Sequence, residues 1–180
     1  MPVLIAMLRG INVSGQKPVK MEVLRSSMAT LGFQGVKTYV QSGNIIFESR
    51  KDSAAKIAAK IAKLIMDDFG FEVPVVVRTA DEMERVVRGN PLLKPAGIDE
   101  SKLHVTFLST AAPETAEEIL SPLVAEPEQV RASGREIYLH CPNGYGNTKI
   151  SNNAIEKKLG VAATTRNWKT VNALLALAKT

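Results

Sequence analysis

The first residues whose types could bind a ligand are the glycine-spaced, basic ones in segment 9–17. Glycines in such a segment let backbone N–H groups converge on an anion, and a following helix would add the positive end of its dipole. Gly10 and Gly15 have P-loop spacing, but Gln16 replaces the required Lys and Pro18 follows Lys17, which excludes a Walker-type nucleotide triphosphatase. A looser phosphate or carboxylate contact and a simple turn remain open, and the candidate ligand-binding residues here are Arg9, Gly10, Asn12, Lys17 and Lys20.

A second candidate is the run Gln41-Ser42-Gly43-Asn44. Glycine and asparagine tolerate positive φ, which suits a hairpin turn. Ser42 lacks the Gly-x-Ser-x-Gly spacing of a nucleophile elbow, so we do not expect it to be catalytic. Turn formation and ligand contact through Gln41, Ser42 and Asn44 are the two interpretations.

Two segments near the end of the chain also carry polar groups. Residues 143–149 resemble the opening of a dinucleotide fingerprint, but Lys149 takes the third glycine position. That loop predicts at most an anion contact through Lys149. In residues 164–168, Asn167 is suited to cap a helix, and it is also a candidate ligand-binding residue together with Arg166. Arg166 can make a bidentate contact to an internal or a bound carboxylate or phosphate.

Metal and cofactor chemistry find no support in the residue pattern. His104, His140 and Cys141 lack the spacing of metal ligands, and the chain shows no paired-carboxylate signature. Cys141 is the single cysteine, which excludes an intramolecular disulfide and predicts a small core residue. We therefore expect no metal, no cofactor and a reducing compartment.

The charge is unevenly distributed along the chain. Residues 1–50 and 141–180 carry net charges of +4 and +5, whereas residues 51–140 carry −4, which gives the total of +5. Such an asymmetry favours an anionic ligand or a nucleic acid backbone if the basic ends meet. The alternative is that these charges are only solvated helix faces.

The bulk composition is that of an ordinary globular protein. The chain has 180 residues, of which 45% are hydrophobic and 23% charged; a chain of this length can bury a sizeable core. Arg9 ends the apolar run 3–8 too early for a signal peptide, and no stretch approaches the ~20 apolar residues of a membrane span. We expect a cytoplasmic protein without membrane contact.

The elements that must position these residues follow from hydrophobic periodicity and breakers. In the first part we expect strands at 3–8, 37–40, 44–47 and 73–77, with helices at 21–31 and from 53 to about 65. In the second part we expect strands at 103–108, 129–132 and 136–140, a short fourth strand near 161–166, and helices at 113–120, 153–159 and 168–178. Thr79 and Glu82 form a capping box that opens a linking helix.

This order predicts an α+β protein made of two ferredoxin-like β-α-β-β-α-β halves, the second one less completely defined. The expected boundaries are 1–78, a linking helix and loop at 79–101, and 102–180. No residue-level repeat is visible, so the repetition is topological. We further expect the loop at 9–17 and the turn at 41–44 to lie at opposite ends of their sheet, and therefore not to share a site.

Three segments carry a family resemblance: LRGINVSG at 8–15, YVQSGNIIF at 39–47 and TTRNW at 164–168. They are similar to the LRGINVGG, YxQSGNVxF and TTRNW-like motifs of the bacterial domain-of-unknown-function family number sixteen ninety-seven, and they occur in the same order. The resemblance implies an α/β protein of ferredoxin-like topology and supplies no catalytic residues.

Three functions compete on this evidence. The first hypothesis is a binding module for an anionic, phosphate-bearing ligand or a nucleic acid backbone. The second is a small-molecule enzyme with Asn12, Gln41, Ser42 or Asn44 at its site, and the third is a structural or oligomerising protein. With 5% aromatic residues and none in strand 3–8, we do not expect the base-stacking platform of RNA-binding ferredoxin-like modules.

Overall fold

The computed structural model describes residues 1–50 and 52–180, which form two compact units. Met1–Glu84 and Leu174–Thr180 make the first unit, and Arg85–Ala173 make the second. Each unit is built on one four-stranded antiparallel sheet. The predicted α+β class with two ferredoxin-like halves is confirmed.

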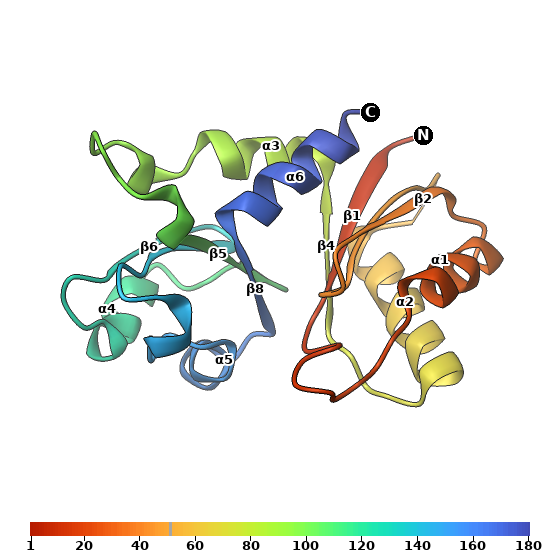
Figure 1. The fold of residues 1–180 in the computed structure, drawn as a ribbon, viewed down its shortest axis with the longest axis horizontal. Coiled ribbons are helices and arrows are strands. Elements are labelled where there is room, and N and C mark those ends of the chain that lie inside the picture. Colours follow the sequence, from red (N-terminus) through yellow and green to blue (C-terminus); the bar gives the residue numbers. More distant parts are fainter. Residues whose placement is uncertain (51) are drawn as a thin grey trace. The chain divides into compact units, whose positions relative to one another are not determined.

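The first unit has the sheet order β2-β3-β1-β4. Its elements are β1 (Val3–Leu8), α1 (Met21–Thr30), β2 (Gln34–Tyr39), β3 (Asn44–Glu48), α2 (Ala54–Phe69) and β4 (Val75–Thr79). Both helices pack on one face of the sheet (Figure 1), and their apolar stripes meet alternate residues of the strands in a buried core. Ser53 caps α2 by accepting a hydrogen bond from the Lys56 N–H, as its residue type predicts.

The link between the sheets begins with α3 (Ala80–Arg88), which continues directly from β4. The predicted capping box is present, because the Thr79 N–H donates to Glu82 Oε2 at 2.8 Å and the Glu82 N–H donates to Thr79 Oγ1 at 3.1 Å. Two 3-10 turns, η1 (Pro91–Leu93) and η2 (Glu100–Lys102), lead to the next strand.

The second unit repeats the topology with the order β6-β7-β5-β8. Its elements are β5 (Leu103–Leu108), α4 (Ala116–Leu120), η3 (Ser121–Leu123), β6 (Gln129–Ser133), β7 (Glu136–His140), η4 (Tyr145–Asn147), α5 (Asn152–Leu159), β8 (Ala163–Asn167) and α6 (Trp168–Ala178). The short fourth strand therefore exists. Helix α4 begins at Ala116 rather than at 113.

The expectation that the loop after β1 and the β2–β3 turn lie at opposite ends of the sheet is wrong. Strand β1 pairs antiparallel with β3, and β3 pairs antiparallel with β2, so β1 and β2 run in the same direction. Helix α1 carries the chain back between them, and both strands therefore finish at the same end. The Leu8 N–H donates to the Gly43 carbonyl there at 2.8 Å.

None of the helices in residues 1–50 and 52–180 is long and apolar enough to cross a membrane.

Candidate functional site

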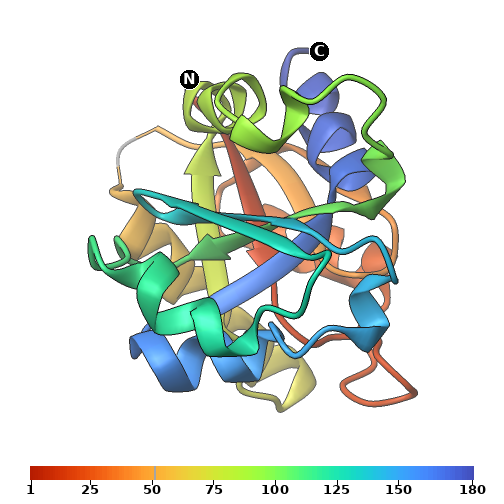
Figure 2. The same ribbon diagram turned by 90° about the vertical axis from the view of Figure 1, so that its left-hand side faces the viewer.

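The loop between β1 and α1, residues 9–20, is called the finger here. Val13 and Gln16 form an isolated antiparallel bridge, and the Gln16 N–H donates to the Val13 carbonyl at 2.8 Å. Ser14 and Gly15 between them have φ values of 49° and 74°, as a tight hairpin turn of the primed type requires. The finger projects beyond the end of β1 in two perpendicular views (Figures 1 and 2).

Three side-chain hydrogen bonds of Asn12, which we call the Asn12 clasp, close the finger and connect it to the β2–β3 turn. Its Oδ1 accepts the Val19 N–H at 2.8 Å, and its Nδ2 donates to the carbonyls of Val19 at 2.9 Å and Gln41 at 2.6 Å. The side-chain amide is thus used to close the loop on itself and to join it to the turn. This is a positioning role, which the sequence hypotheses of ligand contact did not include.

The β2–β3 turn is held equally tightly. Asn44 is fully buried, and its Nδ2 donates to the Tyr39 carbonyl at 3.0 Å and to Ser42 Oγ at 2.9 Å. Gly43 has φ +84°, and a Cβ built on it would lie 2.6 Å from Ile11 Cδ1 and 2.8 Å from Leu8 Cβ. The turn interpretation of this motif is therefore supported at Gly43 and Asn44.

Backbone strain is concentrated at this end of the first unit. Within the described part of the chain, every non-glycine residue with positive φ lies in the finger or the adjoining turn: Asn12, Ser14, Lys17 and Val40. A left-handed conformation costs an L-residue roughly 1–2 kcal/mol. Asparagine relieves part of this cost by local hydrogen bonding, but Lys17 and the β-branched Val40 do not.

The second unit has the same fold without these additions. Twelve residues separate Leu8 from Met21 in the first unit, whereas seven separate Leu108 from Ala116. Four residues connect β2 to β3, whereas two connect β6 to β7. The hydrogen bond at the end of the first strand is nevertheless the same in both units. The Leu108 N–H donates to the Arg135 carbonyl at 2.8 Å, as the Leu8 N–H does to the Gly43 carbonyl. The topology therefore does not require the longer loops.

A surface cavity of about 670 Å³ lies beside the finger. It is bounded by the finger, the second half of α2 and the segment that enters β4, and its lining residues are Arg9, Lys17, Ala62, Lys63, Met66, Glu72, Val73 and Pro74. The Arg9 N–H donates to the Pro74 carbonyl at 3.0 Å, which ties the base of the finger to that segment. We call this space the finger cavity.

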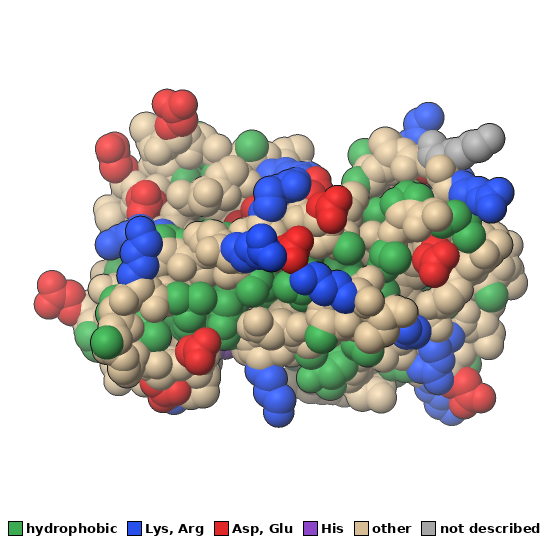
Figure 3. Space-filling model, turned by 90° about the horizontal axis from the view of Figure 1, so that it is seen from above, with side chains coloured by type: hydrophobic (Ala, Val, Ile, Leu, Met, Phe, Trp, Pro, Cys, Tyr) green, Lys and Arg blue, Asp and Glu red, His purple; other side chains and the backbone are tan. Residues whose placement is uncertain are grey.

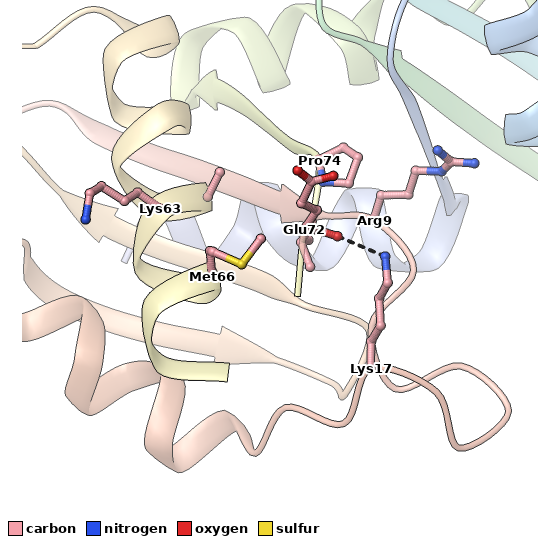
Figure 4. A pocket seen from close by; sticks show the side chains of 8 residues that line it. Arg9, Lys17, Lys63, Met66, Glu72 and Pro74 are labelled. Atoms are coloured by element: carbon pink, nitrogen blue, oxygen red, sulfur yellow. Dashed lines mark hydrogen bonds between the residues drawn. The ribbon is translucent and has the colours of Figure 1, made fainter. Parts of the chain in front are cut away.

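Lys17 lines the finger cavity and bonds to its opposite segment. Its Nζ donates to the Glu72 carbonyl at 2.9 Å, and Figure 4 shows this bond beside Met66 and Pro74. The charged ends of Arg9 and Lys63 point away from Met66 on opposite sides of the same view. Lys63 also forms an ion pair with Asp67 at 2.6 Å, and this hydrogen bond raises the pKa of Lys63.

Of the residues that the sequence singled out, Arg9 and Lys17 therefore come together at the finger cavity, and Asn12 and Gln41 meet in the clasp. Lys20 is exposed at the start of α1 and does not line the cavity. Lys63, Met66 and Glu72 were missed. Their positions next to the core-facing stripe of α2 and before β4 carry no motif that could have marked them.

The candidates of the second unit have different surroundings. Arg166 is buried and donates from Nη1 to Thr164 Oγ1 at 2.8 Å and to the Thr165 carbonyl at 3.0 Å; burial lowers its pKa to about 10. Asn167 accepts the Thr170 N–H at 2.8 Å and so caps α6, as predicted. Lys149 is exposed. In the described residues, no group of three His, Cys, Asp or Glu side chains could hold a metal ion.

Comparison with known proteins agrees with this picture of the fold. Residues 1–138 match the model of the family described as "Protein of unknown function (DUF1697)", which confirms the predicted family. The chain is also similar to the solved structure of a conserved bacterial protein, SP0830, from Streptococcus pneumoniae, with 22% identity, a TM-score of 0.71 and coverage of 98% of each chain. At that identity the likeness shows the fold alone. No curated protein matches the chain.

Proposed function

Since the chain belongs to the DUF1697 family of proteins of unknown function, its function has to be argued from its own residues, and we propose that its first unit binds a small anionic ligand in the finger cavity. The observation that carries this proposal is Lys17. It has a left-handed backbone, and its ammonium group donates to a backbone carbonyl in a lining that also holds Ala62, Met66, Val73 and Pro74.

The conformation of Lys17 supports a functional role. Glycine or asparagine would adopt φ +47° at lower cost, so the backbone conformation does not favour lysine at this position. Strained residues of this kind persist where the surrounding structure over-determines them, and they cluster at ligand sites. The Asn12 clasp supplies that surrounding structure.

The comparison between the two units adds independent support. The second unit closes the same sheet with shorter loops, and Ser109 follows its first strand where Arg9 follows β1. Its Ser109 N–H still donates to the Ala162 carbonyl at 2.9 Å, matching the Arg9–Pro74 bond. The finger and its basic residues are therefore additions to the fold, as a binding site would be.

A small ligand fits these observations better than a nucleic acid backbone. The cavity volume lies within the range of about 300–1,000 Å³ that is common for small-molecule sites. A duplex would need a continuous basic surface, whereas the lining of the cavity includes Glu72 among Arg9, Lys17 and Lys63. On the face that Figure 3 draws, which is not the face of the finger, Lys and Arg side chains also lie beside Asp and Glu.

The test compares Lys17→Asn with Lys20→Asn, two substitutions that remove the same charge from the finger. Acetate and inorganic phosphate are titrated at low salt into the ¹⁵N-labelled full chain, and the amide shifts of residues 9–20 and 62–74 are followed. We expect saturable shifts that Lys17→Asn weakens by about tenfold or more, as for a hydrogen bond to a charged group, and that Lys20→Asn changes less than twofold.

Stability provides the second readout. Because asparagine tolerates a left-handed backbone, Lys17→Asn should leave the urea midpoint unchanged or raise it while binding is lost. If Lys17→Asn and Lys20→Asn weaken anion binding equally, the attraction is a diffuse effect of charge and the proposal is overturned. The proposal is also overturned if neither anion causes amide shifts. If a 12-base-pair duplex binds with a steep salt dependence while the small anions do not, nucleic acid replaces the small ligand.

A further inference from the structure

We infer that the ligand of the finger cavity is a monoanionic carboxylate with an aliphatic body, rather than a phosphate ester or a nucleotide. This inference rests on the proposed function and adds the chemical class of the ligand. Two properties of the lining carry it: the charge balance around Lys17, and the apolar wall opposite.

The charge balance favours a single negative charge. Lys17 directs its ammonium group to the Glu72 carbonyl, and Glu72 adds a carboxylate to the same lining. Lys63 has its own partner in Asp67, and Arg9 points away from Met66 in Figure 4. A dianionic phosphate bound at Lys17 would lie beside the Glu72 carboxylate, which is repulsive for the second charge.

The wall of the finger cavity is aliphatic. It consists of Ala62, Met66, Val73 and Pro74, and none of the described residues that line the cavity is aromatic. Base rings bind by stacking on aromatic or guanidinium planes; the lining has no aromatic plane, and the Arg9 guanidinium points away from Met66 in Figure 4. A flexible alkyl chain instead suits methionine, whose unbranched thioether adapts to irregular apolar shapes.

Met66 is the exposed apolar side chain of this wall. It is 40% exposed, while Ile61, Leu64 and Ile65 on the same helix are buried in the core. Met66 and Lys17 line the same cavity, so the site offers an apolar contact and a positive charge to one ligand. The ammonium group of Lys17 would bind the carboxylate, and Met66 would cover the first methylene groups of the chain.

The first experiment measures dissociation constants for acetate, butanoate, hexanoate and octanoate, and for octyl phosphate and 1-octanol, with the full chain. Burial of one methylene corresponds to roughly a fourfold gain in affinity, so we expect a steady rise along the carboxylate series. Octanoate should bind at least about tenfold more tightly than octanol and more tightly than octyl phosphate.

The second experiment separates the wall from the charge by comparing Met66→Gln with Val23→Gln, which alters an exposed apolar residue of α1 outside the cavity. Met66→Gln should flatten the chain-length dependence of the affinity, and Val23→Gln should leave this dependence as in the parent chain. Equal acetate and octanoate affinities, or tighter octyl phosphate, overturn this inference and leave the proposed function intact. If no anion binds, the proposed function falls with it.

Discussion

Arg78 and Arg166 occupy the same position in the two units. Arg78 on β4 stands opposite Ile5 of β1, and Arg166 on β8 stands opposite Val105 of β5. Each is buried, and each donates from Nη1 to the carbonyl of the residue before it, at 3.1 Å and 3.0 Å. The two halves are therefore equivalent at the level of strand register, although no residue repeat is visible in the sequence.

The residues after these arginines are equivalent as well. Thr79 and Asn167 each end the last strand of a unit and accept a backbone N–H three residues ahead, at 3.1 Å and 2.8 Å. We expect Thr79→Ala and Asn167→Ala each to lower the free energy of unfolding by about 1 kcal/mol through the lost cap. Urea unfolding measures this. A loss below a few tenths of a kcal/mol in both variants would contradict the capping role.

Gly43 and Gly32 form a matched pair for the close packing of the finger. Both have φ +84°, but a Cβ at Gly32 meets nothing within 4 Å, whereas one at Gly43 would collide with Leu8 and Ile11. Gly32→Ala should therefore cost only the left-handed strain of about 1–2 kcal/mol. Gly43→Ala should cost a further ~1–3 kcal/mol for overpacking.

The difference between the unfolding free energies of these two variants isolates the contact between the finger and the turn. Ile11→Ala in the Gly43→Ala background should recover part of the packing cost, because it removes the nearest atom. If Gly32→Ala and Gly43→Ala lower the free energy of unfolding equally, the β2–β3 turn shifts enough to accommodate the added methyl group.

Asn12 can be separated into its backbone and side-chain contributions. Asn12→Gly keeps the left-handed conformation and removes the three clasp bonds, and Asn12→Ala also adds strain. Each net hydrogen bond contributes about 1 kcal/mol. The free energy of unfolding should therefore fall by ~1–3 kcal/mol in the glycine variant and by ~1 kcal/mol more in the alanine variant. The Val19 N–H donates to Asn12 Oδ1, so its amide hydrogen should exchange faster in both variants. An unchanged exchange rate would contradict the role of Asn12 in holding the finger.

Cys141 makes the second unit sensitive to alkaline pH. Burial raises the pKa of its thiol to about 11, so the unfolded chain loses this proton at lower pH than the folded one. The corresponding stability is present in full below pH 9 and is lost as the pH rises toward 11. Urea midpoints at pH 8 and 10.5 should fall less in Cys141→Ala than in the parent chain.

The Cys141→Ala variant is needed as a reference because Tyr138 also titrates at alkaline pH. Burial raises the pKa of Tyr138 to about 12, so its ionisation also lowers the stability of the fold above pH 10. An identical pH dependence in both chains would mean that the thiol does not contribute. Slow modification of native Cys141 by a thiol reagent at pH 8 is the expected companion result.

The sequence by itself determined the elements and their order. Apolar periodicity marked the strands and helices, Ser53 and the Thr79–Glu82 box marked helix starts, and Asn167 marked the last one. These signals are local, because they depend on residues within one or two turns of each other. The topology followed from the order, since β-α-β-β-α-β has few compact arrangements.

Only the tertiary structure decided which loops share a site. The β-α-β order already implies that β1 and β2 run in the same direction, but only packing brings Asn12 to Gln41 across 29 residues. The finger cavity likewise joins Lys17 to Glu72 across 55 residues. Such contacts arise from packing between distant segments, for which spacing along the chain carries no signal.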